Sequence, residues 1–293
     1  MVFGRLLTAM VTPFNEQLEV DYDKARQLAE YLLANGNDGI VVAGTTGESP
    51  TLSKAEKINL FKAVKEAVGN KGQVIAGTGS YSTKDSIELT KAAEETGVDG
   101  VMLVVPYYNK PPQQALSEHF KSLAQCTKLP IFLYNVPGRT SMNMQPETVA
   151  ELAKLPNIVA IKEAAGDMDQ VSALKALVPD DFLVYSGDDS LTLPMLALGA
   201  HGVISVAGHI VGNEIKEMIE AYITGDVVKA QAIHKMLFPV FRTMFITTNP
   251  IPVKTAVNMA VLDTGKMRLP MIEANDEQKR KIVKILEQMG KIQ

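Results

Sequence analysis

The sequence feature that most restricts the fold is an eightfold alternation of short apolar segments with amphipathic helical segments. The apolar segments have the length and β-branched content of buried strands, and they occupy residues 6–11, 39–43, 74–76, 100–105, 131–134, 158–161, 182–185 and 202–206. Helical patterns separate them, for example at residues 21–34, where Leu28, Tyr31 and Leu32 form one apolar stripe. Eight strand–helix units in about 220 residues fit a parallel (β/α)8 TIM barrel better than an open doubly wound sheet. We therefore predict an α/β fold of this type.

The strand pattern stops after Gly212, and the last part of the chain has helical patterns only. Residues from about 226 to 293 form two or three helical segments, broken at Asn249-Pro250-Ile251-Pro252 and at Leu269-Pro270. No flexible linker precedes them. We expect a barrel over residues 1–225 that carries the active site, and a C-terminal helical appendage over residues 226–293.

Composition and charge exclude several classes of protein. With 46% hydrophobic and 21% charged residues, the chain can bury a large core and does not have the composition of a disordered protein. Its net charge of −4 gives no electrostatic footprint for nucleic acid or an anionic membrane, so we expect neither partner. No apolar run reaches transmembrane length, and residues 1–5 lack a signal-peptide layout. The single Cys126 cannot form an internal disulfide, and these points together predict a cytoplasmic protein.

Metal and nucleotide sites have no basis in the sequence. The four histidines, at 119, 201, 209 and 234, show neither HxH nor HExxH spacing, and there is no CxxC pair. The chain also lacks a GxxxxGKS/T loop and a GxGxxG motif after a strand. We therefore expect no metal site and no cofactor.

The sixth predicted strand runs directly into Lys162. A lysine at the end of a buried strand is poorly placed for solvent, and desolvation disfavours its charged form, which leaves an amine nucleophile. In the plainer interpretation, the amine reaches solvent at the strand end and has no role. Taken alone, this stretch favours the plainer interpretation. The residues at the other strand ends favour a catalytic lysine instead.

Polar residues follow several of the other predicted strands, and in a (β/α)8 barrel these strand ends meet around one open mouth. They comprise Gly44-Thr45-Thr46-Gly47 after the second strand, Tyr107-Tyr108 after the fourth, Tyr134 and Arg139 at the fifth, Gly187 after the seventh and Ile204 in the eighth. Each has an ordinary structural explanation, such as a tight turn, a packed ring or a surface cation. Together, a lysine amine, tyrosine and threonine hydroxyls and an arginine specify carbonyl chemistry through a Schiff base. The arginine is the natural partner for a substrate carboxylate.

Six motifs make the chain resemble the pyruvate-dependent class I aldolases of the N-acetylneuraminate lyase and dihydrodipicolinate synthase superfamily. They are GTTGES at 44–49, VVPYYNKP at 104–111, YNVPGRT at 134–140, IKEA at 161–164, SGDD at 186–189 and GVISV at 202–206. Their order and spacing span essentially the whole chain and are most similar to the 4-hydroxy-tetrahydrodipicolinate synthase branch. The resemblance implies a lyase of lysine and diaminopimelate biosynthesis that condenses pyruvate with L-aspartate 4-semialdehyde and needs no cofactor.

The resemblance also implies the catalytic roles. Lys162 would form the imine with pyruvate, and Tyr134 would be the general acid and base. Thr45 would connect Tyr134 to Tyr108, which a neighbouring subunit would lend across a dimer interface. Members of this family are commonly tetramers built as dimers of dimers, and some are dimers, so we expect a homo-oligomer.

Four further residues would bind substrate if the resemblance holds. Thr46 and its backbone would hold the pyruvate carboxylate, and the Ile204 carbonyl would contact the bound substrate. Gly187 belongs to the same binding set. Arg139 would bind the carboxylate of the semialdehyde.

Two alternatives remain open. The first is a sister aldolase acting on N-acetylneuraminate or a 2-keto-3-deoxy sugar acid, whose relatives usually have a small residue where Arg139 stands. The second is a ligand-sensing protein that has kept the fold without the catalysis. Lys162, Tyr134, Tyr108 and Thr45 are all present, which argues against the second alternative.

Many relatives are inhibited by lysine bound in a cleft at the tight dimer interface. In this chain the cleft would be lined by Ser49, Pro50, Lys54, Lys57, Tyr81, Asp85 and Tyr107. Lysine-sensitive relatives typically have a histidine or carboxylate at position 57 and an asparagine at position 81. Lys57 adds a positive charge that repels the ammonium group of lysine, and Tyr81 adds bulk to the cleft. We therefore predict an enzyme that is insensitive to lysine. In the alternative interpretation, Lys54 and Lys57 lie on an exposed helix face and pair with Glu56 or Glu48. In that case too the chain would have no lysine-binding site.

Overall fold

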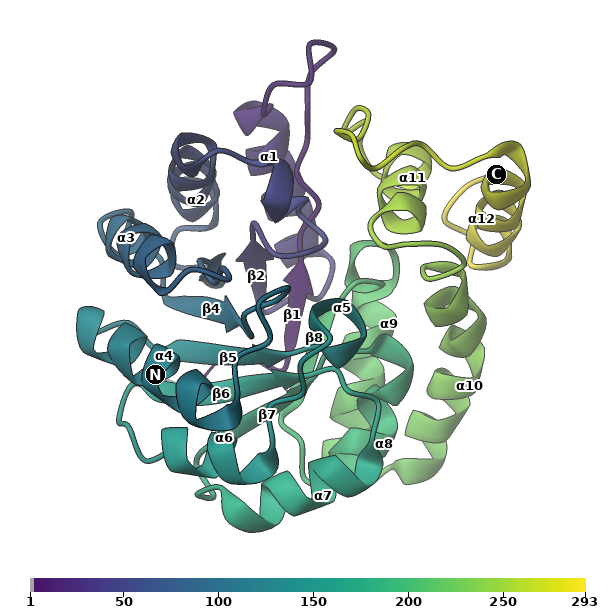
Figure 1. Ribbon diagram of the computed structural model, residues 1–293. Coiled ribbons are helices and arrows are strands. Elements are labelled where there is room, and N and C mark those ends of the chain that lie inside the picture. The colour runs from purple at the N-terminus through teal and green to yellow at the C-terminus, as the bar shows by residue number, and fades with distance from the viewer. Residues whose placement is uncertain (1–2) are drawn as a thin grey trace.

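The computed structural model describes residues 3–293, so Met1 and Val2 of the N-terminal stretch lie outside the described residues. Eight parallel strands form a closed barrel in which neighbours in sequence pair with each other and β8 pairs with β1 (Figure 1). This arrangement confirms the predicted (β/α)8 barrel. The strands are β1 (Leu6–Ala9), β2 (Gly39–Val42), β3 (Gln73–Gly77), β4 (Gly100–Val104), β5 (Ile131–Asn135), β6 (Ile158–Glu163), β7 (Leu183–Ser186) and β8 (Gly202–Ser205).

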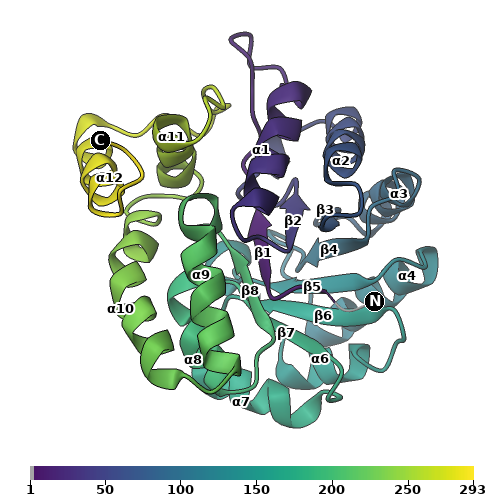
Figure 2. The ribbon, with the colours of Figure 1, turned by 180° about the vertical axis from the view of Figure 1, so that it is seen from behind.

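Helices surround the barrel on its outer side (Figures 1 and 2). They are α1 (Tyr22–Ala34), α2 (Lys54–Val68), α3 (Thr83–Glu94), α4 (Gln113–Cys126), α6 (Pro146–Leu152), α7 (Met168–Leu177), α8 (Thr192–Ala197) and α9 (Gly208–Ile223). The short helix α5 (Pro137–Thr140) lies over one end of the barrel instead (Figure 1), and the loops also contain the 3-10 turns η1 (Ser49–Thr51) and η2 (Asp189–Leu191). A capping box begins α2: the Ser53 hydroxyl accepts from the Glu56 backbone, and the Glu56 carboxylate accepts from the Ser53 backbone. Pro146 begins α6, a position that suits the fixed φ of proline.

The element boundaries differ slightly from the prediction. Strand β1 ends at Ala9 instead of residue 11, and β7 begins at Leu183 instead of residue 182. The short helix α5 was not predicted; Pro137 occupies its first turn, where the fixed proline φ suits a helix. This helix matters because it carries Arg139.

Strands β5 and β6 are paired through a register shift. Ile131 pairs with Ile158 but Phe132 pairs with Ala160, so Val159 is an extra residue without a partner on β5. Beyond this bulge, Tyr134 lies opposite Lys162, and Asn135 lies opposite Glu163.

Two apolar clusters lie on the two sides of the barrel wall. The larger fills the space between the strands and the surrounding helices. The smaller fills the barrel interior and comprises Phe3, Leu7, Ala9, Val41, Ile75, Met102, Phe132, Tyr134, Val136, Ala160, Tyr185 and Ile204. Because strand side chains alternate, Tyr134 and Lys162 point to the interior, whereas Asn135 and Glu163 point to the helices.

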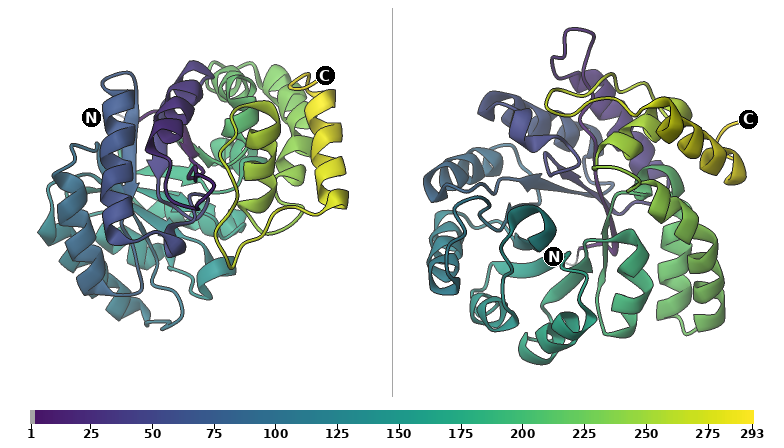
Figure 3. Two further views of the ribbon diagram at one scale, coloured as in Figure 1. Left: turned by 90° about the horizontal axis from the view of Figure 1, so that it is seen from above. Right: turned by 45° about the vertical axis from the view of Figure 1, so that its right-hand side comes forward.

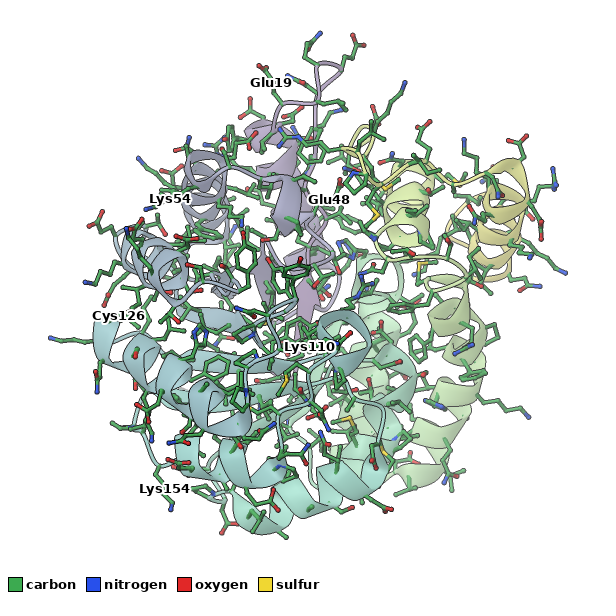
Figure 4. All side chains as sticks on the ribbon, viewed as in Figure 1. Glu19, Glu48, Lys54, Lys110, Cys126 and Lys154 are labelled. Carbon is green, nitrogen blue, oxygen red and sulfur yellow. The ribbon has the colours of Figure 1, made fainter. Side chains whose placement is uncertain are left out.

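Three helices follow the barrel: α10 (Val227–Thr243), α11 (Ile251–Ala260) and α12 (Asp276–Gln288). They gather on one side of the barrel (Figure 3), and α10 packs against α9. The predicted boundary between residues 225 and 226 falls in the turn between α9 and α10, and the division into two regions remains a prediction. Within residues 3–293, no helix has both the length and the apolar character needed to cross a membrane. Cys126 ends α4 and is half-buried (Figure 4).

Candidate active site

A cavity of about 210 Å3 lies where the carboxyl ends of β2, β3, β4 and β5 converge. Ligands of (β/α)8 barrels bind at this face. Three of the predicted site residues, Thr45, Tyr134 and Arg139, line the cavity. The other lining residues are Ala43, Gly44, Ser49, Pro50, Gly77, Gly79, Met102, Val104, Tyr107, Val136 and Thr140.

Lys162 lies beside Tyr134 in the barrel wall. Its Nζ is 4.6 Å from the centroid of the Tyr134 ring, and only 5% of the residue is exposed. Within the described part of the chain, no carboxylate forms an ion pair with this amine. The lysine is therefore buried at the strand end, as predicted, instead of reaching solvent.

Gly187 lies directly against this lysine. Its backbone N–H donates to the Glu163 carbonyl at 2.7 Å. A Cβ at this position would lie 3.2 Å from Lys162 Cε and 2.5 Å from the Ala164 Cβ, so only glycine fits. Ile204 is fully buried in the same interior cluster as Tyr134. The structure thus brings Gly187 and Ile204 into the neighbourhood of Lys162 and Tyr134.

The Thr45–Thr46 loop is a compact turn after β2. Backbone N–H groups of Gly47 and Ser49 both donate to the Gly44 carbonyl, at 3.1 and 3.2 Å. Thr46 is buried, and its hydroxyl oxygen accepts a hydrogen bond from Asn249 Nδ2 at 2.9 Å. These hydrogen bonds and the contact with Asn249 hold the loop and its two threonines in place.

Arg139 places a cation at the edge of the cavity. It lies on α5, its side chain is exposed, and Nη2 donates to the Asn249 carbonyl at 3.3 Å. It forms no salt bridge within residues 3–293. The guanidinium is thus available to an anionic ligand.

Two of the predicted catalytic residues, Lys162 and Tyr108, do not line the cavity; Lys162 lies beside the lining residue Tyr134, whereas Tyr108 is directed away. Tyr108 is 92% exposed and has φ of +74°, whereas the neighbouring Tyr107 lines the cavity. Tyr107 packs edge-on against Tyr81, with 5.3 Å between the ring centroids. The tyrosine loop therefore presents Tyr108 outward from the barrel.

A buried polar network behind the two strand ends was missed by the sequence reasoning. The Glu163 carboxylate accepts hydrogen bonds from Asn135 Nδ2 at 3.0 and 3.2 Å, from Gln170 Nε2 at 3.2 Å and from the Ala165 backbone at 2.7 Å. Asn143 completes the network by bonding to both amides. Burial raises the pKa of Glu163, and the hydrogen bonds oppose this rise. The only local signal for this network was the pair of polar residues that immediately follow Tyr134 and Lys162.

The sequence reasoning also missed a buried ion pair that joins the C-terminal region to the loop after β2. Lys254 Nζ donates to Glu48 Oε1 at 2.8 Å, and Figure 4 shows Glu48 between the N-terminal elements and the C-terminal segments. The partners expected for Lys54 and Lys57 are wrong. Glu48 pairs with Lys254, Glu56 pairs with Arg268, and Lys54 pairs with Glu88.

A larger hollow of about 900 Å3 lies at the opposite end of the barrel, among residues that precede the strands. Two ion pairs line it: Lys65 binds Asp99 at 2.7 Å, and Lys216 binds Asp38 at 2.8 Å. Arg5, Lys71 and Glu220 line it as well. We assign the site to the smaller cavity, because it lies at the carboxyl ends of the strands, where Thr45, Tyr134 and Arg139 come together. Within residues 3–293, no three His, Cys, Asp or Glu side chains lie close enough to share a metal ion.

Comparisons with known proteins agree with this geometry. A profile of the Dihydrodipicolinate synthetase family matches residues 2–289. The chain is 60% identical over 273 residues to the 4-hydroxy-tetrahydrodipicolinate synthase of Desulforamulus reducens, covering 93% of this chain and 92% of the relative. The crystal structure of the Cyanidioschyzon merolae enzyme with lysine bound superposes with a TM-score of 0.97, at 46% identity and 99% coverage of each chain. The chloride-inhibited Acinetobacter baumannii enzyme complexed with pyruvate superposes with a TM-score of 0.95, at 38% identity, covering 99% of this chain and all of that one. The chain therefore belongs to the dihydrodipicolinate synthetase family.

Proposed function

We propose that this chain condenses pyruvate with L-aspartate 4-semialdehyde to give 4-hydroxy-tetrahydrodipicolinate. It would be a lyase of the class I aldolase type, acting in lysine and diaminopimelate biosynthesis in the cytoplasm. The observation that carries the proposal is the pairing of Lys162 with Tyr134 on adjacent strand ends, 4.6 Å from amine to ring centroid. Schiff-base chemistry needs an amine nucleophile and a neighbouring group that moves protons. The pyruvate bound by the Acinetobacter baumannii relative supports the same first substrate.

The reaction follows from the lysine amine. Lys162 Nζ attacks the keto carbon of pyruvate, and water leaves to give a protonated imine. Loss of a methyl proton gives an enamine, whose carbon attacks the aldehyde carbon of the semialdehyde. The amino group of the semialdehyde then attacks the imine carbon, expels Lys162 and closes the ring. One water is lost overall, so the atoms of the two substrates are accounted for.

Tyr134 is the proposed proton carrier for these steps. Its ring centroid is 4.6 Å from the Lys162 amine, and both Tyr134 and Thr45 line the cavity. Thr45 would pass protons between Tyr134 and Tyr108 of a neighbouring subunit. The exposure of Tyr108 on its own chain supports this arrangement, and it requires at least a dimer, with a dimer of dimers as the expected assembly.

Two groups are proposed to hold carboxylates, and two more to contact the bound pyruvate. Thr46 would bind the pyruvate carboxylate, with Gly187 and the Ile204 carbonyl alongside. Arg139 would bind the carboxylate of the semialdehyde. The unpaired Arg139 guanidinium at the cavity edge favours this acid over the neutral chain of a sugar acid, which is the main alternative substrate class.

Borohydride trapping tests the proposal. Reduction in the presence of pyruvate should attach the three-carbon unit to Lys162 alone, as read by peptide mass mapping, and turnover should survive EDTA. Lys162→Ala should take up no label. Labelling of Lys162→Ala, or loss of turnover with EDTA, would show that the mechanism is wrong. Trapping without turnover would favour the ligand-sensing alternative.

A further inference from the structure

Asn249, which precedes α11, connects the C-terminal region to both of the proposed carboxylate-binding residues. Its side-chain Nδ2 donates to Thr46 Oγ1 at 2.9 Å, and its backbone carbonyl accepts from Arg139 Nη2 at 3.3 Å. Only 5% of the residue is exposed, and among the described residues its Oδ1 has no hydrogen-bond partner. The buried amide is therefore held through Thr46.

The direction of the Asn249–Thr46 hydrogen bond determines what the threonine hydroxyl can do. A hydroxyl has one proton and two lone pairs. Because Asn249 Nδ2 is a donor, it occupies a lone pair of Thr46 and leaves the hydroxyl proton free. An acceptor in the same place would take up that proton. A donor behind Thr46 therefore fixes the hydroxyl with its proton free for a carboxylate, whereas an acceptor there would compete for that proton.

We propose that Asn249 is a positioning residue that directs the Thr46 hydroxyl proton to the carboxylate of pyruvate. The inference rests on the proposed function, because it takes Thr46 as the group that binds this carboxylate. Asn249 acts through Thr46 and need not touch the substrate. Arg139 is held by the backbone carbonyl, which side-chain substitutions leave in place. The two carboxylate sites can therefore be separated by experiment.

The loop that carries Thr46 has a second anchor that does not involve Asn249. Glu48, two residues further on, accepts hydrogen bonds from Lys254 Nζ at 2.8 Å and from the Arg268 backbone at 3.0 Å. These contacts keep the loop in place when the amide is removed. An Asn249 variant therefore reports on the orientation of the hydroxyl and not on unfolding of the loop.

The first test measures Asn249→Ala in steady-state kinetics and in borohydride trapping. The pyruvate KM and the pyruvate concentration that half-saturates trapping should rise about 3- to 10-fold, the effect of one neutral hydrogen bond. The semialdehyde KM should stay within about twofold, because the Arg139 contact is unchanged. Asn258→Ala is the matched control. Asn258 also lies in the C-terminal region, but within residues 3–293 its side chain bonds only to Thr264 and Gly265, so its loss should alter neither KM.

A second variant and a double-mutant cycle make the test sharper. Asn249→Asp keeps the size but replaces the donor with an acceptor, and it should raise the pyruvate KM more than Asn249→Ala does. Thr46→Val removes the hydroxyl. Adding Asn249→Ala to Thr46→Val should raise the pyruvate KM no further, because both changes act through one group.

Three results would overturn the inference: additive losses in the cycle, an equal rise in both KM values, or an unchanged pyruvate KM in both Asn249 variants. Failure of the unsubstituted enzyme to trap pyruvate on Lys162 would count against the proposed function itself. Normal trapping with an unchanged pyruvate dependence in the Asn249 variants would count against this inference alone.

Discussion

Breaking the Lys254–Glu48 pair should destabilise the protein far more than breaking a surface pair. Both side chains are 1% exposed. Lys254 Nζ donates to Glu48 Oε1 at 2.8 Å and to the Thr12 and Lys266 carbonyls at 2.9 Å each, so all three of its N–H groups are used. It also lies 4.2 Å from the Phe14 ring centroid. Lys254→Met leaves a buried carboxylate without its counter-ion, which costs about 3–5 kcal/mol.

The size of the effect on melting temperature follows from the chain length. A chain of 293 residues has an unfolding entropy of about 0.6 kcal/mol/K, from about 2.1 cal/mol/K per residue. Lys254→Met should therefore lower Tm by about 5–8 °C, as measured by circular dichroism, with urea titration to check the free energy. Lys54→Met is the control. It breaks the Lys54–Glu88 pair, whose side chains are 51% and 47% exposed, and should cost at most about 1 kcal/mol.

The double variant Lys254→Met, Glu48→Gln shows how much of the lost stability comes from the unpaired Glu48 charge and how much comes from lost packing. Removing both charges should recover much of the stability that Lys254→Met loses, because the penalty comes mainly from the uncompensated carboxylate. The reasoning is refuted if Lys254→Met costs no more than Lys54→Met. It is also refuted if the double variant is less stable than Lys254→Met alone.

Three further predictions concern the site and its regulation. Arg139→Ala should raise the semialdehyde KM far more than the pyruvate KM, because loss of a charge-assisted pair costs about 2–5 kcal/mol; equal effects would indicate a structural arginine and reopen the sugar-acid alternative. Mixing inactive Tyr108→Phe subunits with inactive Lys162→Ala subunits should restore activity, since one site of a mixed dimer is then intact; hybrids without activity would mean that Tyr108 serves its own barrel. L-lysine should not inhibit. Lys54 is already paired with Glu88, so Lys57 carries the argument, and a second cation about 4 Å from it is repelled by about 4 kcal/mol. Half-maximal inhibition below about 1 mM in a purified assay would contradict this argument.

The barrel could be predicted because each of its strands and helices has a recognisable pattern within its own stretch of sequence. Each strand is a short apolar run and each helix has its own periodicity, so eight repeats leave few architectures open. The convergence of residues at the strand ends was predictable for the same reason. Strand ends of a parallel barrel meet at one face, so Lys162, Tyr134 and Thr45 could be expected near one another. Arg139 lies on α5, which was not predicted, and its position depends on loop geometry.

What the sequence could not reveal depends on contacts between distant segments. Asn249 reaches Thr46 from 203 positions away, and Lys254 reaches Glu48 from 206 positions away. Neither residue has a local motif, and Asn249 was noted only as part of a helix break. The expected role of Tyr108 involves a neighbouring subunit, and it remains a prediction.

The bulge in β6 has a consequence for how insertions and deletions would act on this enzyme. If Val159 paired with Phe132 in an uninterrupted ladder, Ile161 would lie opposite Tyr134 and Lys162 opposite Asn135. The amine would then point at the surrounding helices, and the carboxylate of Glu163 would take the inward direction. The single unpaired residue shifts the inward and outward alternation of the later side chains in β6 by one position. It decides which of two adjacent ionisable side chains enters the barrel. An insertion or deletion of one residue in β6 that the bulge did not absorb would turn Lys162 outward and Glu163 inward. The barrel would then contain a carboxylate in place of the amine, although the sequence would still encode every residue of the site.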